Sequence, residues 1–245
     1  MLRWLLLSLL LLLHPAHAAI TLQSGTDSHP AKKQLVQQIN SHIDFVNTHY
    51  LLPFTVTVRL DQGEGPLFDA ILNEIWIPYH FVHEITAVFT TMNYYPDQRD
   101  NAVAGVIAHT FFHELGHAFI ANLQFPLLGM EEDAVDTLAT IIMINQRYPQ
   151  DGIFMALAAA DAFDAEDRMA NHRLSNDSHF YGNHSLDAQR YYRTICLIVG
   201  ADAVNTISII EELDWEEAKL LECSWEYKHK TRSVNTLLAP YIKQQ

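Results

Sequence analysis

The stretch NAVAGVIAHTFFHELGHAFIAN, residues 101–122, contains no Lys or Arg and a single carboxylate, Glu114. Its apolar residues are spread around the whole circumference of a helix, so we expect a helix over about 97–122 that is buried nearly all round. A charge in such a helix is costly unless a partner or a metal ion compensates it. Glu114 therefore indicates a functional site rather than ordinary packing.

Two histidines of this stretch have the spacing of metal ligands. His113 and His117 are four residues apart, so their imidazoles project from one helix face, one turn apart, and can bind a single Zn²⁺. Glu114 lies off that face and points toward a metal-bound water, which predicts a general base. His109 lies about 12 Å from His117 along the helix, so we expect it to pack or to support a ligand.

A second helix, expected over about 130–148, begins with three acids, as suits a helix N-terminus. A catalytic zinc site needs a third protein ligand and leaves one position open. We predict Glu132 as that ligand, with Glu131 and Asp133 as alternatives.

The two motifs together, residues 113–117 and then Glu132 with Asp136, resemble those of the gluzincins, the thermolysin-like branch of the zinc metallopeptidases. The resemblance implies Glu132 as the third ligand and Asp136 as the acceptor of a ligand-histidine N–H, which fixes the orientation of that ring. The link between the motifs is shorter than in thermolysin. Over residues 112–118, 126–136 and 184–192, and at both cysteines, the chain also looks like a bacterial family described only as metallopeptidases, with no assigned substrate.

Gluzincins use a His or Tyr beyond the metal motifs to stabilise the oxyanion that forms during hydrolysis. The longer resemblance implies His184 for this role, and Tyr181 and Arg190 are alternatives. Asn183 stands where the resemblance leads us to expect an acid.

Residues 1–18 are typical of a secretory signal peptide. Arg3 precedes an apolar run, residues 5–13, that is too short to span a bilayer comfortably, and Ala16 and Ala18 are small residues at the positions that a signal peptidase reads. We expect cleavage after Ala18, no stable membrane anchor afterwards, and a secreted or periplasmic protein.

The only two cysteines, Cys196 and Cys223, remain after cleavage and are expected to pair in an oxidising compartment. Such a bridge would stabilise the C-terminal part by roughly 3 kcal/mol. The formal charge is −14, and it becomes more negative when the signal peptide and its Arg3 are removed. Nucleic acid is therefore not expected as a partner.

The predicted fold is α+β, a single domain over residues 19–245. Residues 32–47 have helical spacing, and residues 54–60 and 71–79 alternate as two strands of a small sheet packed on the motif helix. Pro78 cannot donate a ladder hydrogen bond, so we expect the second strand at a sheet edge, where an extended peptide could add. The C-terminal half is expected to be mainly helical, with helices at about 152–170, 185–200, 202–212 and 214–230.

These features predict a zinc metallohydrolase with one zinc ion per chain, and most directly a peptidase acting on a peptide or protein. His113, His117 and Glu132 would hold the ion, Glu114 would be the general base and His184 the oxyanion donor. Two alternatives stay open. The first is a zinc amidase that acts on a cell-wall or other non-peptide amide, and the second is a non-catalytic zinc-binding envelope protein.

Overall fold

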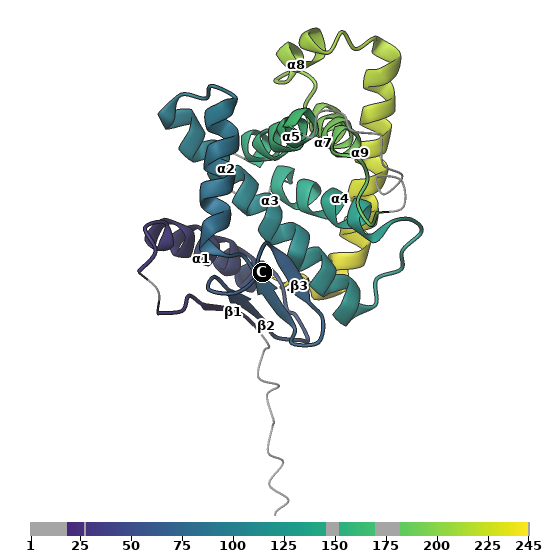
Figure 1. The fold of residues 1–245 in the computed structure, drawn as a ribbon. Helices are drawn as coiled ribbons and strands as arrows, with labels where there is room; N and C mark the ends of the chain where they lie inside the picture. The colour runs from purple at the N-terminus through teal and green to yellow at the C-terminus, as the bar shows by residue number, and fades with distance from the viewer. Residues whose placement is uncertain (1–18, 27, 146–151, 170–181, 245) are drawn as a thin grey trace, which may run out of the picture.

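The computed structural model describes residues 19–26, 28–145, 152–169 and 182–244. A small four-stranded sheet lies near the N-terminus and the rest is mainly helical (Figure 1), which confirms the predicted α+β class. The predicted signal peptide, residues 1–18, lies outside the described residues. Among the residues described, no helix combines the length and apolar character needed to cross a membrane.

The elements follow one another in this order: β1 (Ile20–Gln23), α1 (Lys32–His49), β2 (Val56–Arg59), β3 (Leu67–Asp69), β4 (Glu74–Trp76), α2 (Tyr79–Thr91), α3 (Pro96–Leu123), α4 (Glu131–Ile144), α5 (Gly152–Met169), α7 (Asp187–Ala201), α8 (Ile207–Glu212), α9 (Glu217–Leu238) and the 3₁₀ turn η1 (Ala239–Tyr241). The predicted helices at 32–47, 97–122, 130–148, 152–170 and 185–200 are confirmed as α1, α3, α4, α5 and α7. The third C-terminal prediction, 202–212, corresponds only to the short α8, and the fourth, 214–230, corresponds to α9, which extends beyond it.

The sheet has the strand order β1-β2-β4-β3, with β1, β2 and β4 parallel and β3 antiparallel to β4. The prediction that the second strand lies at an edge is therefore wrong, because β4 pairs on both sides. Pro78 does not disturb the ladder, since β4 ends at Trp76 and Pro78 is the N-cap of α2. The edge strand beside β4 is β3.

Sequence patterns missed β1, β3 and α2. The two strands have four and three residues, too few for a period-two pattern to stand out. Helix α2 begins inside the segment expected to be a strand, although its buried residues Val82, Ile85 and Phe89 have the spacing of one helix face.

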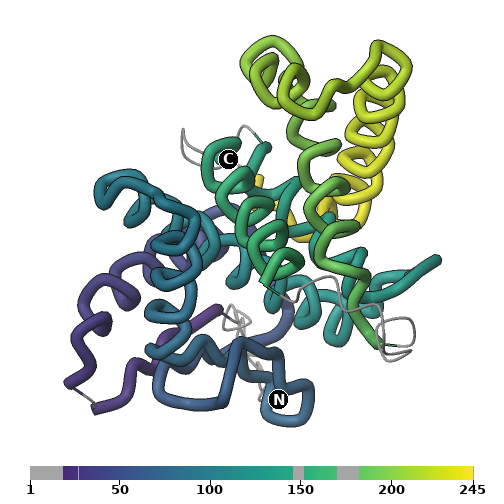
Figure 2. The backbone as a smooth tube through the Cα atoms, turned by 45° about the horizontal axis from the view of Figure 1, so that its top comes forward, coloured from purple at the N-terminus to yellow at the C-terminus, as the bar shows by residue number. Residues whose placement is uncertain are grey.

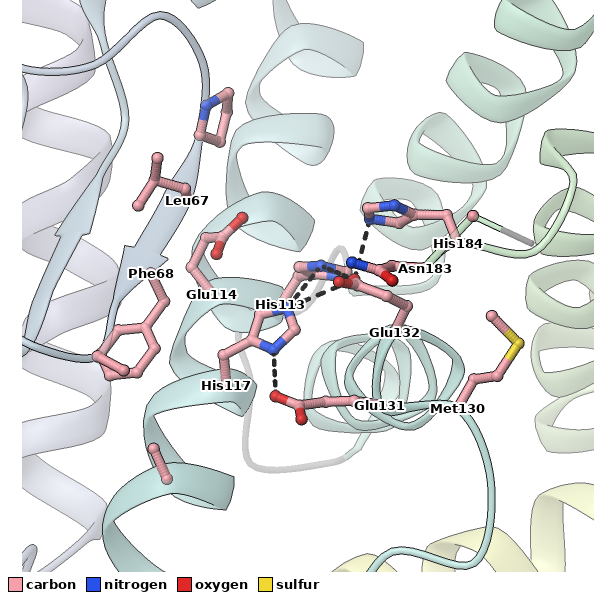
Figure 3. Close-up of a pocket in the computed structure, with 14 residues that line it drawn as sticks. Leu67, Phe68, His113, Glu114, His117, Met130, Glu131, Glu132, Asn183 and His184 are labelled. Carbon is pink, nitrogen blue, oxygen red and sulfur yellow. Dashed lines mark hydrogen bonds and ion pairs between the residues drawn. The ribbon is translucent and has the colours of Figure 1, made fainter. Parts of the chain in front are cut away.

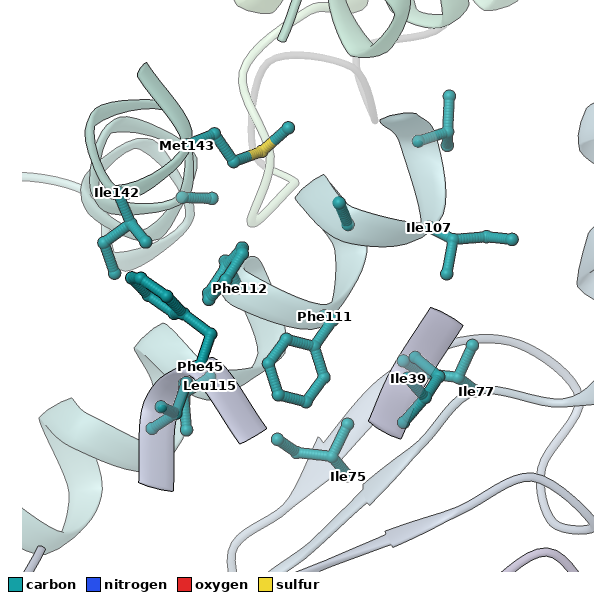
Figure 4. Packing of buried hydrophobic residues seen from close by; sticks show 14 of the residues in the cluster. Ile39, Phe45, Ile75, Ile77, Ile107, Phe111, Phe112, Leu115, Ile142 and Met143 are labelled. Atoms are coloured by element: carbon teal, nitrogen blue, oxygen red, sulfur yellow. The ribbon is translucent and has the colours of Figure 1, made fainter. Parts of the chain in front are cut away.

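Helix α3 occupies the centre of the core, and its buried side chains point in more than one direction (Figure 4). Phe111 faces Ile75 and Ile77 at the end of the sheet, whereas Phe112 lies between Phe45 of α1 and α4. The helix is thus buried nearly all round, as predicted, and it also packs on α2 and α5.

The C-terminal helices are tied together at one point. Cys196 of α7 and Cys223 of α9 form the predicted disulfide, and both residues are buried. Figure 2 shows α7 and α9 side by side, with the chain turning back between them through α8. Helix α7 also packs on α4 and α5, so the bridge supports the side of the molecule on which the candidate site lies.

Candidate metal centre

The site forms where α3 and α4 approach each other closely. Gly116 lies at this contact, and a Cβ atom there would be only 2.8 Å from Cγ1 of Val135. Because glycine has no side chain, the first turn of α4 can lie beside the histidine-bearing turn of α3. Figure 3 shows the result: His113 and His117 from α3 and Glu132 from α4 point toward one another.

Three side-chain atoms define the centre. Nε2 of His113 lies 3.3 Å from Nε2 of His117, and Oε2 of Glu132 lies 3.1 Å from the first and 3.4 Å from the second. A tetrahedral ion with bonds of about 2.0–2.1 Å, the length typical of zinc, holds its ligand atoms about 3.3 Å apart. The three predicted ligands therefore have the separation and the donor types of one face of a tetrahedral metal site.

The environment of Glu132 also favours a bound cation. Its Oε2 is buried and makes no properly aligned hydrogen bond with any described residue, although three imidazole nitrogens lie within 3.4 Å. Burial alone would raise the pKa of the Glu132 carboxyl, but the surrounding imidazoles hold it well below its ordinary value. A charged, buried oxygen without an aligned donor is compensated well by a metal ion.

His184 is the third of these imidazoles. Its Nε2 lies 3.0 Å from Oε2 of Glu132, and His113, Glu132 and His184 each offer a ligand atom within 4.8 Å of the others. The His184 side chain is 53% exposed, against 15% for His117. The geometry therefore brings the predicted oxyanion donor to the metal centre itself, on its open side.

Asp136 makes the contact that the resemblance implied. Its Oδ1 accepts a hydrogen bond from Nδ1 of His113 at 2.7 Å, which leaves Nε2 of that ring facing the centre. Burial disfavours a proton on His113, but Asp136 and Glu132 outweigh it and raise the pKa of His113 to about 9. The site is thus organised to hold positive charge.

Arg190 holds Asp136 in place. Its Nε and Nη2 donate to the two oxygens of Asp136 at 2.8 and 3.0 Å. This fork-like contact fixes the carboxylate plane and, through it, the His113 ring. Arg190 therefore contacts Asp136, and its oxyanion role stays a prediction. The other alternative, Tyr181, lies outside the described residues.

The two acids beside Glu132 have separate partners. Glu131 Oε1 accepts a hydrogen bond from Nδ1 of His117 at 2.8 Å, so it orients the second histidine as Asp136 orients the first. Asp133 Oδ1 binds the Ser185 hydroxyl and an Arg193 guanidinium nitrogen, each at 2.7 Å. Neither acid points its carboxylate at the centre, and Asp133 instead anchors the residue next to His184.

Glu114 faces a large cavity. This cavity has a volume of about 750 Å³ and lies between β3 and the start of α4, with His113, His117 and His184 in its wall (Figure 3). Glu114 is buried, makes no hydrogen bond or ion pair with a described residue, and has its pKa raised by that burial. A carboxylate in this position is able to take a proton from a molecule held at the centre.

His109 does not reach the centre. It is buried, its Nε2 lies 3.4 Å from the hydroxyl of Thr140, and its ring centroid is 6.3 Å from that of His113. It packs behind His113, as expected from its position one turn back.

The chain was compared with known proteins. A family model described as "Putative metallopeptidase" (DUF4344) matches residues 24–238. No curated protein and no solved structure matches the chain. Membership of the gluzincins therefore stays a prediction. The match covers both helices of the metal centre and most of the sequence, so the chain belongs to this metallopeptidase family.

Proposed function

We propose that the protein is a zinc-dependent peptidase in which His113, His117 and Glu132 hold the ion. The observation that carries the proposal is the triangle of predicted ligand atoms, 3.1 to 3.4 Å apart. Beside it, in an open cavity, lies the buried carboxylate of Glu114, which has no hydrogen-bond or ion-pair partner among the described residues. We place His117 in the ligand set ahead of His184 because its ring is less exposed and is anchored by Glu131. His184 then lies at the open position.

A zinc ion at this centre would lower the pKa of water and polarise a substrate carbonyl. Glu114 takes one proton from the attacking water as its oxygen bonds to the carbonyl carbon, and delivers that proton to the nitrogen of the leaving amine as the peptide C–N bond then breaks. The raised pKa of Glu114 favours this transfer. His184 donates a hydrogen bond from Nε2 to the carbonyl oxygen as negative charge develops there.

The substrate is proposed to be an extended peptide or protein segment. β3 is an edge strand that pairs only with β4, and Leu67 and Phe68 of β3 line the cavity opposite Glu132. An extended chain can add to such an edge through backbone hydrogen bonds. Strand addition at β3 replaces the addition expected at residues 71–79, because the strand in that segment, β4, lies inside the sheet.

The decisive experiment uses Glu114→Gln, which keeps the shape of the side chain but cannot accept a proton. The variant should retain about one zinc ion per chain, while turnover of a peptide found in a library screen falls by about 10²–10⁴. Its stability should hold or rise, because a buried charge is removed. Glu217→Gln, at the exposed start of α9, is the matched control and should change neither property.

Wild-type turnover by zinc-loaded Glu114→Gln would refute Glu114 as the base. Cell-wall fragments should be assayed beside the peptides. If only those fragments are cleaved, the substrate of this centre is a non-peptide amide of the cell wall. Zinc binding without cleavage of any substrate would favour a structural role.

We also propose that the protein acts outside the cytoplasm, in the periplasm or as a secreted protein. The signal-like sequence of residues 1–18 and the disulfide between Cys196 and Cys223 support this location, since such bridges persist in oxidising compartments. Sequencing the N-terminus of protein recovered from the periplasm or medium should begin at Ala19. An N-terminus at Met1 would count against cleavage.

A further inference from the structure

A second, smaller cavity lies directly behind the metal centre. Its volume is about 180 Å³, and it shares Pro66, His113, Glu114 and His184 with the large cavity. A water molecule needs only about 10–15 Å³ of such space, so the cavity has room for a side chain. Its shared wall places that side chain next to the bond that the proposed reaction would cleave.

One part of the wall of this cavity is apolar. Phe81 and Ile85 of α2, Val106 of α3, and Ala162 and Phe163 of α5 line it. Such walls suit the aliphatic part of a side chain.

Besides Glu114, a second carboxylate lines this cavity. Glu166 lies on the same face of α5 as Ala159, Ala162 and Phe163, at helical spacing, and it lines the cavity. It makes no hydrogen bond or ion pair with any residue that the structure describes. Burial and the nearby Asp187 raise the pKa of Glu166 to about 6. A carboxylate that is partly removed from water and has no hydrogen-bond donor costs folding free energy, unless a ligand supplies the donor.

The nearest cation does not supply that donor. Arg190 also lines the cavity, but its Nε and Nη2 are engaged by Asp136 and its Nη1 lies 3.6 Å from Asp187. Its Cζ lies 3.9 Å from the centroid of the Phe163 ring. The guanidinium is thus committed to Asp136, and Glu166 remains available to a guest.

We infer that this cavity is a specificity subsite that binds a lysine or arginine side chain next to the scissile bond, with the alkyl stem against Phe81 and Phe163 and the cation at Glu166. Long basic side chains suit this arrangement because they bury the stem on apolar surface and keep the charged end at a polar partner. The inference rests on the proposed peptidase function for the placement of the scissile bond.

The test uses two matched sets of alanine peptides in which one position at a time holds lysine or norleucine, whose uncharged side chain has nearly the same length. Binding is measured by calorimetry on the zinc-loaded Glu114→Gln protein, and kcat/KM is measured on the zinc-loaded wild type. At one position, lysine should be preferred by about 10- to 100-fold, the effect of a charged hydrogen bond.

Adding Glu166→Gln should reduce the preference to near one, while zinc content and thermal midpoint stay unchanged. Glu211→Gln, an exposed acid on α8, should keep the full preference. Equal binding of both sets, no binding of the lysine set, or a preference that survives Glu166→Gln would overturn the inference. If lysine peptides bind selectively through Glu166 but are never cleaved, the subsite stands and the proposed peptidase function fails.

Discussion

Two buried histidines lie on different sides of α3, and their surroundings differ. His42 of α1 packs on Phe111 and Phe112, with ring centroids 5.6 and 5.8 Å away. His113 of α3 faces α4 and contacts the carboxylates of Asp136 and Glu132. The exposed fractions of the two residues are almost equal, 5% and 7%. Burial therefore does not distinguish the functional histidine from the structural one.

Their pKa values separate in opposite directions. Burial among apolar groups lowers the pKa of His42 to about 4, so the ring stays neutral at physiological pH. Burial acts in the same direction on His113, but its two carboxylate partners outweigh it and raise the pKa of His113 to about 9. The comparison teaches that the acids contributed by α4, rather than the histidines alone, make one side of α3 a cation site.

The largest expected effect comes from truncating one histidine on each side. His113→Ala removes a ligand that the fold cannot replace, so the purified variant should lose stoichiometric zinc. His42→Ala should keep its zinc and lose about 2–4 kcal/mol of stability, because it leaves a hole between aromatic rings. Metal analysis by mass spectrometry and chemical denaturation measure the two outcomes. Full zinc content in His113→Ala would remove that residue from the proposed ligand set.

The metal centre was largely predictable because its parts are local in sequence. The i, i+4 spacing places His113 and His117 on one face, and Glu132 and Asp136 repeat that spacing one helix later. Which of the adjacent acids faces α3 depends on the rotation of α4, where successive residues differ by about 100°. For that reason the role of Glu131 as the partner of His117 was not found from sequence.

Other contacts were beyond sequence reasoning because they join distant segments. Arg190 meets Asp136 across 54 positions of the chain, and no local pattern predicts that pairing. Glu166 shares a helix face with small and aromatic residues, yet only the packing of α5 beside α2 and α3 shows that this face lines a cavity. The prediction that β4 lies at an edge of the sheet failed for the same reason. β3, which covers that edge, has only three residues, and its pairing with β4 is visible only in the folded structure.

The second prediction changes one acid of α4. It tests whether these acids cause the difference between the two sides of α3. Asp136→Asn keeps the size of the side chain but removes the charge that orients and polarises His113, so zinc affinity should fall by about 10- to 100-fold. The control is Asp161→Asn on α5, a carboxylate that accepts a hydrogen bond from Tyr94 and contacts no proposed ligand. Competition with a zinc chelator gives both affinities. Equal values for the two variants would mean that Asp136 does not tune the centre.

The last effect is absent at neutral pH and concerns the other side of α3. The folded-state pKa of His42, about 4, is below its unfolded value of about 6.5. Between these values the unfolded chain binds a proton that the folded protein excludes, so His42 lowers stability as pH falls from 6.5 to 4 and contributes no further change below 4. The full difference is about 3 kcal/mol at about 1.4 kcal/mol per pKa unit.

His42→Phe removes this titration while keeping a ring between Phe111 and Phe112. Whatever the variant costs in packing is the same at every pH, so the informative quantity is the slope of unfolding free energy against pH, measured with urea. The variant should lose about 2–3 kcal/mol less than the wild type between pH 6.5 and 4. Parallel slopes would show that His42 accepts a proton in the folded protein as readily as in the unfolded chain, and the proposed pKa contrast with His113 would then be wrong.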